Sequence, residues 1–206
     1  MKQYPSISKV IPSGDNWYVF DKIDGSNVRA EWNKKQGFHK FGSRKVLLGE
    51  IGASDAQTLL GESLGLIKEL AEPLAKVFQD QRWQEVVCFF EFYGPSSFAG
   101  AHIAEPHKVA LLDVHVHKKG MLDVREFLDL FDGKVHTPKL LHQGTFTADM
   151  ATEVRNGTLP DMTFEGIVAK APISKKWSEP AMFKVKNQAW IDKVRALHGE
   201  KADYYL

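Results

Sequence analysis

A short polar run, Asp21-Lys22-Ile23-Asp24-Gly25-Ser26-Asn27, is the part of this sequence with the most evident capacity for chemistry. It places an amine next to carboxylates at a tight turn, because Asp-Gly is typical turn chemistry. A lysine acts as a nucleophile only after losing its proton, and burial or nearby positive charge lowers its pKa to allow this. As an isolated string, the run is more typical of a surface turn after a strand than of a nucleophile.

The run is followed by four other strings that mix charged, aromatic and glycine residues. They are Gly42-Ser43-Arg44, Phe89-Phe90-Glu91-Phe92-Tyr93-Gly94, Phe164-Glu165-Gly166-Ile167-Val168-Ala169-Lys170 and Phe183-Lys184-Val185-Lys186-Asn187. Lys184 and Lys186 alternate along an expected strand, so both side chains should point to one face. Glu91 lies in an apolar run where a charge is costly to bury without a purpose, which favours a role in a site. Cys88 beside it is most simply a small core residue.

The elements that must position these strings read as strands with interspersed helices. Apolar and β-branched runs predict strands at Trp17–Ile23, Val28–Trp32, Val86–Phe92, Val109–His117, Thr163–Lys170 and Ala181–Val185. Helical spacing of apolar residues predicts a helix capped at Ser54-Asp55 and running to Phe78, which Pro73 should kink or split. Further helices are expected at Val124–Phe131 and Gln188–Leu197. The irregular order of strands and helices indicates an α+β fold built on antiparallel sheets with flanking helices.

Length and composition set broad limits on the class of protein. The 206 residues allow one large domain or two small ones, and 43% hydrophobic and 26% charged residues are ordinary for a globular protein. No apolar stretch approaches the roughly 20 residues of a membrane span, and the first residues lack a signal-peptide core. The single cysteine excludes an internal disulfide framework and fits a reducing compartment, so a cytoplasmic location without membrane contact is expected.

Positive charge is concentrated in two segments although the net charge is only +1. Residues 34–45 carry five basic residues and no acid, and residues 170–195 carry seven basic residues against two acids, whereas residues 49–85 have a net charge of −4. Such a distribution could present a basic face to phosphates. Charge runs alone, however, are more often solvated surface.

Taken together and in order, these strings resemble the covalent nucleotidyltransferase superfamily, which includes ATP-dependent RNA and DNA ligases and mRNA capping enzymes. The resemblance is greatest to the phage-type RNA ligase 2 family, whose motifs K-x-[DH]-G-[ST]-N, E-x-x-G, E-G-x-V-x-K and K-x-K-N match here. The opening Tyr4-Pro5-Ser6-Ile7 is also similar to that family, and the match extends to Asn187. The resemblance implies an ATP-grasp-like nucleotidyltransferase (adenylation) domain that occupies residues 1–206.

The resemblance also implies a role for each matching residue. Lys22 would attack the α-phosphorus of ATP and form lysyl-AMP. Lys184 and Lys186 would hold the α-phosphate and help depress the pKa of Lys22. Glu165 would bind Mg²⁺ or Mn²⁺, whose preferred ligands include carboxylate and phosphate oxygens. Glu91 would accept hydrogen bonds from the ribose hydroxyls, Arg44 would contact phosphate or ribose, and Lys170 would be a further phosphate contact. In the turn after Lys22, Asp24 and Asn27 would help orient the metal, the phosphates or the nucleic-acid end, and Gly25 would act in nucleotide binding.

The implied reaction then passes AMP to a 5′-phosphate, after which a 3′-hydroxyl attacks and AMP leaves. RNA is favoured over DNA as the partner, and the basic segments would contact the substrate strand. A solvated face remains the alternative for Lys34, Lys35, Lys175 and Lys176. The location would be host cytoplasm if the source is viral.

Two departures from the family pattern stand out. The aromatic residue that stacks on adenine should lie near Val109, which is aliphatic. Only 19 residues follow Asn187, too few for an OB-fold or a helical C-terminal domain, which argues against a capping enzyme. The substrate would then be held by the basic face, a homodimer or an accessory protein. The alternatives are a minimal DNA ligase, an adenylyltransferase that needs a partner to seal, and a nucleotide-sensing module.

Histidine and aromatic residues elsewhere in the sequence could also have site roles. His115 and His117 face one way on an expected strand and could form a metal pair, but a structural or solvent-facing role is favoured. Core packing is expected for four aromatic residues, Trp17, Trp32, Phe89 and Phe90. Phe38 and Phe41, which lie among basic residues, could either stack on bases or pack in the core.

Overall fold

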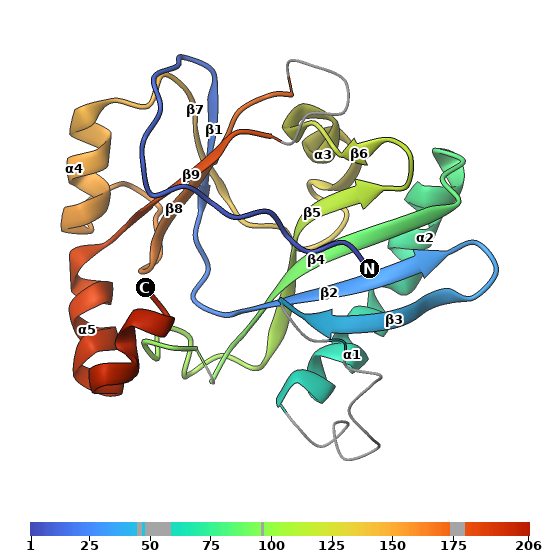
Figure 1. Cartoon of the computed structure of the whole chain (residues 1–206), viewed down its shortest axis with the longest axis horizontal. Helices are drawn as coiled ribbons and strands as arrows, with labels where there is room; N and C mark the ends of the chain where they lie inside the picture. Colours follow the sequence, from blue (N-terminus) through green and yellow to red (C-terminus); the bar gives the residue numbers. More distant parts are fainter. Residues whose placement is uncertain (45–46, 48–58, 96, 174–179) are drawn as a thin grey trace.

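The computed structural model describes residues 1–44, 47, 59–95, 97–173 and 180–206, which form two antiparallel sheets with helices packed against them (Figure 1). This confirms the α+β fold expected from the sequence. The predicted cap at Ser54-Asp55 lies outside the described residues, as do Lys45, Lys175 and Lys176. Within the described residues, no helix has the length and apolar character needed to cross a bilayer.

The smaller sheet carries most of the charged strings identified above. Its strands are β7 (Leu140–Gly144), β1 (Trp17–Asp21), β8 (Gly166–Lys170) and β9 (Met182–Lys186), in that spatial order. One face packs against helix α4 (Ala148–Asn156) through a core that includes Val19, Ile167 and Phe183. Because side chains alternate along a strand, the register that pairs Phe20 with Val168 and Val168 with Lys184 puts these three on the other face.

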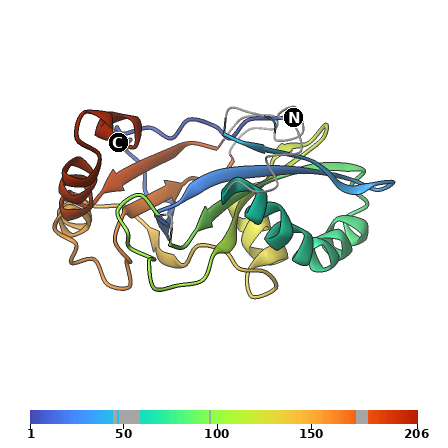
Figure 2. The same cartoon turned by 90° about the horizontal axis from the view of Figure 1, so that it is seen from below.

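The larger sheet carries Glu91 and the main hydrophobic core. Its strands are β3 (Gly37–Ser43), β2 (Ser26–Asn33), β4 (Glu85–Tyr93), β5 (Lys108–Val116) and β6 (Gly120–Met121). One face, with Val28 and Phe90, is covered by helices α1 (Leu59–Glu69), α2 (Ala71–Asp80) and α3 (Val124–Phe131). Figure 2 shows α1 and α2 on this face and the N-terminal segment crossing the opposite one. Glu91 therefore lies on the face opposite these helices.

The expected split of the long helix is confirmed. Helix α1 ends at Glu69, and Leu70 caps α2, so that Pro73 lies in the first turn of α2. A proline is tolerated there because the first amides of a helix have no intrahelical partner. The break between α1 and α2 thus puts Pro73 at a position where it removes no helical hydrogen bond.

The N-terminal segment is attached to both sheets. The Arg29 guanidinium donates to the carbonyls of Met1 (3.0 Å) and Lys2 (2.9 Å) on the large sheet. On the small sheet, Ser8 forms a parallel bridge to Phe183, with Ser8 N donating to Met182 O and Lys184 N donating to Ser8 O. The segment therefore covers the edge of β9, the strand that carries Lys184 and Lys186.

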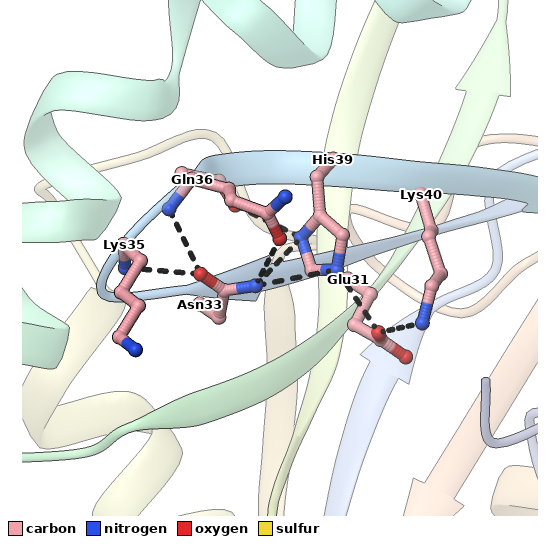
Figure 3. A network of polar contacts seen from close by, with 7 residues as sticks. Glu31, Asn33, Lys35, Gln36, His39 and Lys40 are labelled. Carbon is pink, nitrogen blue, oxygen red and sulfur yellow. Dashed lines mark hydrogen bonds and ion pairs between the residues drawn. The ribbon is translucent and has the colours of Figure 1, made fainter.

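The β2–β3 hairpin extends the large sheet beyond the core, and Figure 3 shows the polar contacts along it. A register shift lies beside Glu31, whose carboxylate has two partners on β3: Lys40 Nζ lies 2.7 Å and His39 Nε2 3.3 Å from Glu31 Oε1. Phe38 and Phe41 pack against the core, which decides between the two roles considered for them. Trp17, Trp32, Phe89 and Phe90 are buried, as predicted.

Most predicted elements agree with the structure to within three residues. Strand β8 begins at Gly166 rather than Thr163, and β1 ends at Asp21 rather than Ile23, because the Asp21 carboxylate accepts hydrogen bonds from Thr163 and closes both strands there. Helix α5 (Gln188–His198) is followed by the 3₁₀ segment η2 (Gly199–Tyr204). The sequence reasoning missed β3, β6, β7, α4 and η2.

Candidate active site

Lys22 lies immediately after β1, where the backbone is fixed from two sides. Its own amide donates to Gly166 O (2.9 Å), and the amide of Asp21 donates to Lys139 O (2.9 Å). The Asp21 carboxylate accepts from both the amide and the hydroxyl of Thr163, each at 2.9 Å. The position of Lys22 is therefore set by rigid neighbours, as a reactive group requires.

Two glycines allow the backbones around Lys22 to approach closely. A Cβ on Gly25 would lie 2.4 Å from Phe92 O, and one on Gly166 would lie 2.1 Å from Val185 O. Gly166 also has φ +137°, a conformation that side chains disfavour. Gly25 was expected to act in nucleotide binding. In the structure, its absent side chain lets the turn after Lys22 pack on β4.

The Glu165 carboxylate joins two of the predicted lysines. Lys22 Nζ lies 2.8 Å from Glu165 Oε2, and Lys186 Nζ lies 3.1 Å from Glu165 Oε1. The Glu165 side chain is only 4% exposed, whereas that of Lys22 is 19% exposed. The structure thus brings together residues that are 143 positions apart, with Lys22 at the solvent side of the cluster.

The strand β9 supplies positive charge beside Lys22. Burial, followed by the charges of Lys186 and Lys22, lowers the pKa of Lys184 to about 8. Burial also lowers the pKa of Lys186, although Glu165 opposes this. The amines of Lys22, Lys184 and Lys186 therefore lie around Glu165, where a phosphate could bind to them.

One electrostatic expectation is wrong. Lys184 and Lys186 were expected to depress the pKa of Lys22, but in the structure this pKa is raised. Burial lowers it, yet the carboxylates of Glu165, Glu91 and Asp24 together outweigh burial. Lys22 therefore sits in the structure as an ammonium ion, and its use as a nucleophile needs a change in the charge around Glu165.

Glu91 faces this cluster from the large sheet. Burial is the main reason that its pKa rises to about 8, with Lys22 and Arg44 opposing the shift. Asn27 lies directly opposite Glu91 in the register of β2 and β4, and its amide donates to Phe90 O (3.3 Å). The Asn27 Oδ1 atom is buried without a hydrogen-bond partner among the described residues, and Arg44 is exposed.

Asp24 is nearby but has a different set of partners. Its carboxylate accepts from the amides of Phe98 (3.2 Å) and Ala99 (2.8 Å), in the turn that follows β4. Burial raises its pKa, and these amides act against that rise. Asp24 thus links the turn after Lys22 to the turn after β4.

Lys170 does not join the Lys22 cluster. Its ammonium lies 2.7 Å from Asp113 Oδ2 and donates to Leu112 O at 2.8 Å, at the far end of β8. The hydroxyl of Tyr4 also donates to Asp113. Val109, near which the adenine-stacking residue was expected, packs in the core on the helix-covered face of the large sheet. Neither residue therefore faces Lys22.

Sequence reasoning missed several residues that support the site. Trp190 on α5 lies under Lys186, with its ring centroid 3.9 Å from Nζ, and Tyr205 O accepts from the same Nζ at 3.0 Å. Asn187 caps α5 by accepting from Ala189 N, and its own amide donates to Glu165 O. Only the cap had a signal in the sequence, an asparagine directly before a helix.

Glu165 could serve as one ligand of a divalent ion in this site. Among the described residues, no group of three or more histidine, cysteine, aspartate or glutamate side chains could hold a metal. Glu165 and phosphate oxygens together fit Mg²⁺ or Mn²⁺, since Mg²⁺ is usually held by one or two carboxylates and substrate phosphates. His115 is half-buried and His117 exposed, in agreement with the role favoured for them.

Known structures share this architecture. An RNA ligase of Naegleria gruberi, in a variant bound to AMP and manganese, matches with a TM-score of 0.67 and 17% identity over 94% of this chain and 58% of that chain. The same ligase with pyrophosphate gives a TM-score of 0.67 and 18% identity over 94% and 58%. A protein of Aquifex aeolicus, named as a candidate ATP-dependent DNA ligase, gives 0.63 and 14% over 93% and 51%.

This chain therefore spans little more than half the length of those solved chains. No curated protein matches its sequence significantly. Residues 15–186, which include Lys22, Glu91, Glu165 and the Lys184–Lys186 pair, match the family described as RNA ligase. The chain belongs to the RNA ligase family.

Proposed function

We propose that this protein is an ATP-dependent RNA ligase that forms lysyl-AMP at Lys22. The supporting observation is that Lys22 Nζ lies 2.8 Å from one oxygen of the Glu165 carboxylate and Lys186 Nζ 3.1 Å from the other, with Lys184 beside them. The cluster holds three amines, and the Lys22 side chain in it is 19% exposed. An ATP α-phosphate placed there could bind to these amines.

In the first step, Lys22 Nζ attacks the α-phosphorus in line with the leaving group. Lys22 first loses its ammonium proton to solvent. A nitrogen–phosphorus bond then forms as the bond to the bridging oxygen breaks, pyrophosphate leaves, and the nitrogen passes a second proton to solvent. Lys184 and Lys186 would contact the phosphate oxygens. A divalent ion held by Glu165 would supply positive charge that counters the phosphates and lowers the pKa of Lys22.

Glu91 would orient the ribose. With a pKa of about 8, it is mostly protonated at neutral pH and could both donate to and accept from hydroxyl groups. Arg44 is exposed near Glu91 and would contact phosphate or ribose. Asn27 has an unpartnered buried oxygen on this face, which could accept from a bound hydroxyl.

In the later steps, AMP passes from Lys22 to a nucleic-acid 5′-phosphate, and a 3′-hydroxyl then displaces it. Both are in-line displacements at phosphorus, so one phosphate site would serve them. Exposed Lys34, Lys35 and Lys40 on the β2–β3 hairpin would contact the strand beyond Arg44. The resemblance to a candidate DNA ligase keeps DNA as the alternative substrate.

Intact mass after incubation with ATP and Mg²⁺ tests the first step. We expect the wild type to gain the mass of one AMP, Lys22→Ala to gain none, and Lys68→Ala, an exposed lysine on α1, to behave as the wild type. Absence of an adduct in a wild type that still binds ATP would leave a nucleotide-sensing module as the better description.

The adenylated protein is then mixed with nicked RNA and nicked DNA without free ATP. Sealing of RNA in preference to DNA supports the proposal, and the reverse preference indicates a DNA ligase. Loss of AMP to the 5′-phosphate without sealing would indicate an adenylyltransferase that needs a partner.

A further inference from the structure

The segment after helix α5 contacts the candidate active site at two separate points. Its residues are His198 at the end of α5, η2 (Gly199–Tyr204) and the final Tyr205-Leu206. At the first point, Tyr205 O accepts a hydrogen bond from Lys186 Nζ at 3.0 Å. At the second, His198 Nε2 lies 2.8 Å from Phe98 O, and a carbonyl partner requires that this nitrogen donate.

Packing holds this segment in place. The Tyr205 ring lies between Phe98 and His198, with centroids 4.6 Å and 4.5 Å away. Below it, Ala99, Trp190, Val194 and Ala202 form a small buried cluster. Figure 1 shows the end of the chain lying against α5, next to the turn that follows β4.

These contacts form a closed chain of neighbouring residues that includes Lys22. Lys22 and Asp24 belong to one turn, and Asp24 holds the amides of Phe98 and Ala99. Phe98 contacts His198 and Tyr205, Tyr205 holds Lys186, and Lys186 shares Glu165 with Lys22. A displacement of the segment would therefore reach both sides of the phosphate site.

Lys186 in particular needs such support. Its side chain is long and rotatable, and Glu165, Tyr205 O and the Trp190 ring contact its ammonium from different directions. Fixing a long side chain before the substrate arrives removes an entropic cost from the reaction. The Tyr205 partner is a neutral main-chain carbonyl, so it holds the Lys186 ammonium without neutralising the positive charge that a phosphate would bind.

We propose that His198 and Tyr205 are positioning residues, which hold Lys186 and the Phe98–Ala99 turn in the geometry needed for transfer of the nucleotidyl group. The proposal rests on the proposed function for its catalytic consequence. It goes beyond that function because His198 and Tyr205 belong to none of the sequence motifs described above. Both residues also lie outside residues 15–186, the part that matches the family.

The catalytic test compares each alanine variant with a conservative one. Tyr205→Ala removes the ring that anchors the carbonyl, whereas Tyr205→Phe keeps it; His198→Ala removes the donor, whereas His198→Gln supplies an amide donor. We expect the alanine variants to lower the single-turnover rate of Lys22 adenylation about 10- to 100-fold, since small misplacements are costly. The KM for ATP should stay within about threefold, and the conservative variants near wild type.

Leu197→Ala, at a neighbouring side chain that is 60% exposed, is the matched control and should have no effect. Thermal unfolding of every variant shows whether it is folded at the assay temperature. Equal loss of activity in the alanine and conservative variants, or a rate unchanged in the alanine variants, would overturn the proposal.

A second readout does not depend on activity. Brief acetylation with acetic anhydride, quantified by mass spectrometry, reports how accessible each lysine is. Tyr205→Ala should raise labelling of Lys186 at least about fivefold relative to Lys68, because the Tyr205 carbonyl, no longer anchored by its ring, would release and uncover the ammonium. Unchanged labelling would overturn the proposal even if the variant adenylates poorly. Suppose instead that the wild type gains no AMP but Tyr205→Ala still raises Lys186 labelling. The proposed function would then be refuted, whereas the positioning of Lys186 by Tyr205 would stand.

Discussion

Two clusters of lysine and carboxylate lie at opposite ends of strand β8, and they differ in charge balance and closure. Before its first residue, Glu165 is shared by Lys22 and Lys186, with Lys184 adding a third ammonium. At its last residue, Lys170 pairs with Asp113 alone. The Lys22 side chain is 19% exposed, whereas those of Lys170 and Asp113 are 6% and 3% exposed.

The Glu165 cluster can accept a ligand, whereas the Lys170–Asp113 cluster already has a partner for each charged group. Asp113 receives the ammonium of Lys170 and the hydroxyl of Tyr4, and Lys170 also donates to Leu112 O. Every strong polar group there has a partner, so it ties β8 to β5 and the N-terminal segment. The Glu165 cluster holds three amines and is more exposed at Lys22, so an anion could reach and bind these amines.

The largest expected effect is on stability, at the closed cluster. Asp113→Ala would leave the Lys170 ammonium buried without its counter-ion, so we expect a loss of about 3–5 kcal/mol in unfolding free energy. Urea denaturation measures this loss. Replacing both partners, as Asp113→Leu with Lys170→Met, should recover most of it, since the buried charge is then gone.

A loss of activity without a loss of stability in Asp113→Ala would change the comparison between the Glu165 and Asp113 clusters. If Asp113→Ala keeps its stability but loses adenylation as fully as Lys184→Ala, then Lys170 contacts phosphate, as the family resemblance implies. The two clusters would then form one site.

The second prediction uses pH. The pKa of Glu91 is raised from 4.5 to about 8 in the folded protein, so the folded state binds the proton more tightly than the unfolded chain. The resulting stability is fully present below about pH 4.5 and is lost as pH rises through about 8. Glu91→Gln has no such dependence, so its unfolding free energy relative to wild type should rise by about 1.4 kcal/mol per pH unit across this window. Equal slopes for both proteins in urea titrations at several pH values would contradict this.

The third prediction concerns the open cluster. Lys184→Ala should lower the single-turnover rate of Lys22 adenylation about 100-fold, equivalent to about 2.7 kcal/mol, with no loss of stability. Because the pKa of Lys184 is about 8, its charge is present below that pH and lost above it. The affinity for ATP should therefore fall as pH rises through about 8.

Lys184→Arg is the control for this interpretation. Arginine stays charged at every accessible pH, so calorimetric titration with ATP should show a weaker pH dependence than the wild type. The same dependence in both proteins would assign it to another group, with Glu91 the first to test.

The smallest expected effect is at the edge of the closed cluster. Tyr4→Phe removes one hydroxyl that donates to Asp113, while the ring keeps its contact with Phe89 at 5.0 Å. We expect a loss of about 1 kcal/mol in unfolding free energy and an unchanged adenylation rate. A change in that rate would show that the closed cluster communicates with Lys22.

The sequence was a good guide to the strands and helices with strong apolar patterns. Helix α3 has the predicted bounds, and β4 and β5 lie within one residue of theirs. Strand β7, Leu-Leu-His-Gln-Gly, was missed because it has no buried face and no alternation. Helix α4 had detectable signals, since Thr147 caps its start and Gly157 adopts a left-handed conformation at its end.

For the candidate site, the sequence indicated which residues to compare but not their electrostatics. Ordered motifs indicated Lys22, Glu165, Lys184 and Lys186, which the structure brings together. The raised pKa of Lys22 could not be predicted, because it depends on how many carboxylates tertiary folding gathers around one amine. For the same reason, nothing in the string that ends at Lys170 indicated its pairing with Asp113.

The bridge between Ser8 and Phe183 has a consequence for the order of folding. These residues are far apart in the chain, and contacts of such separation close late because of loop entropy. Until they meet, β9 has a bare edge that a strand from another molecule could join, which is a known route to aggregation. The strand that carries Lys184 and Lys186 is thus completed near the end of folding, so conditions that slow this closure should favour aggregation before activity is reached.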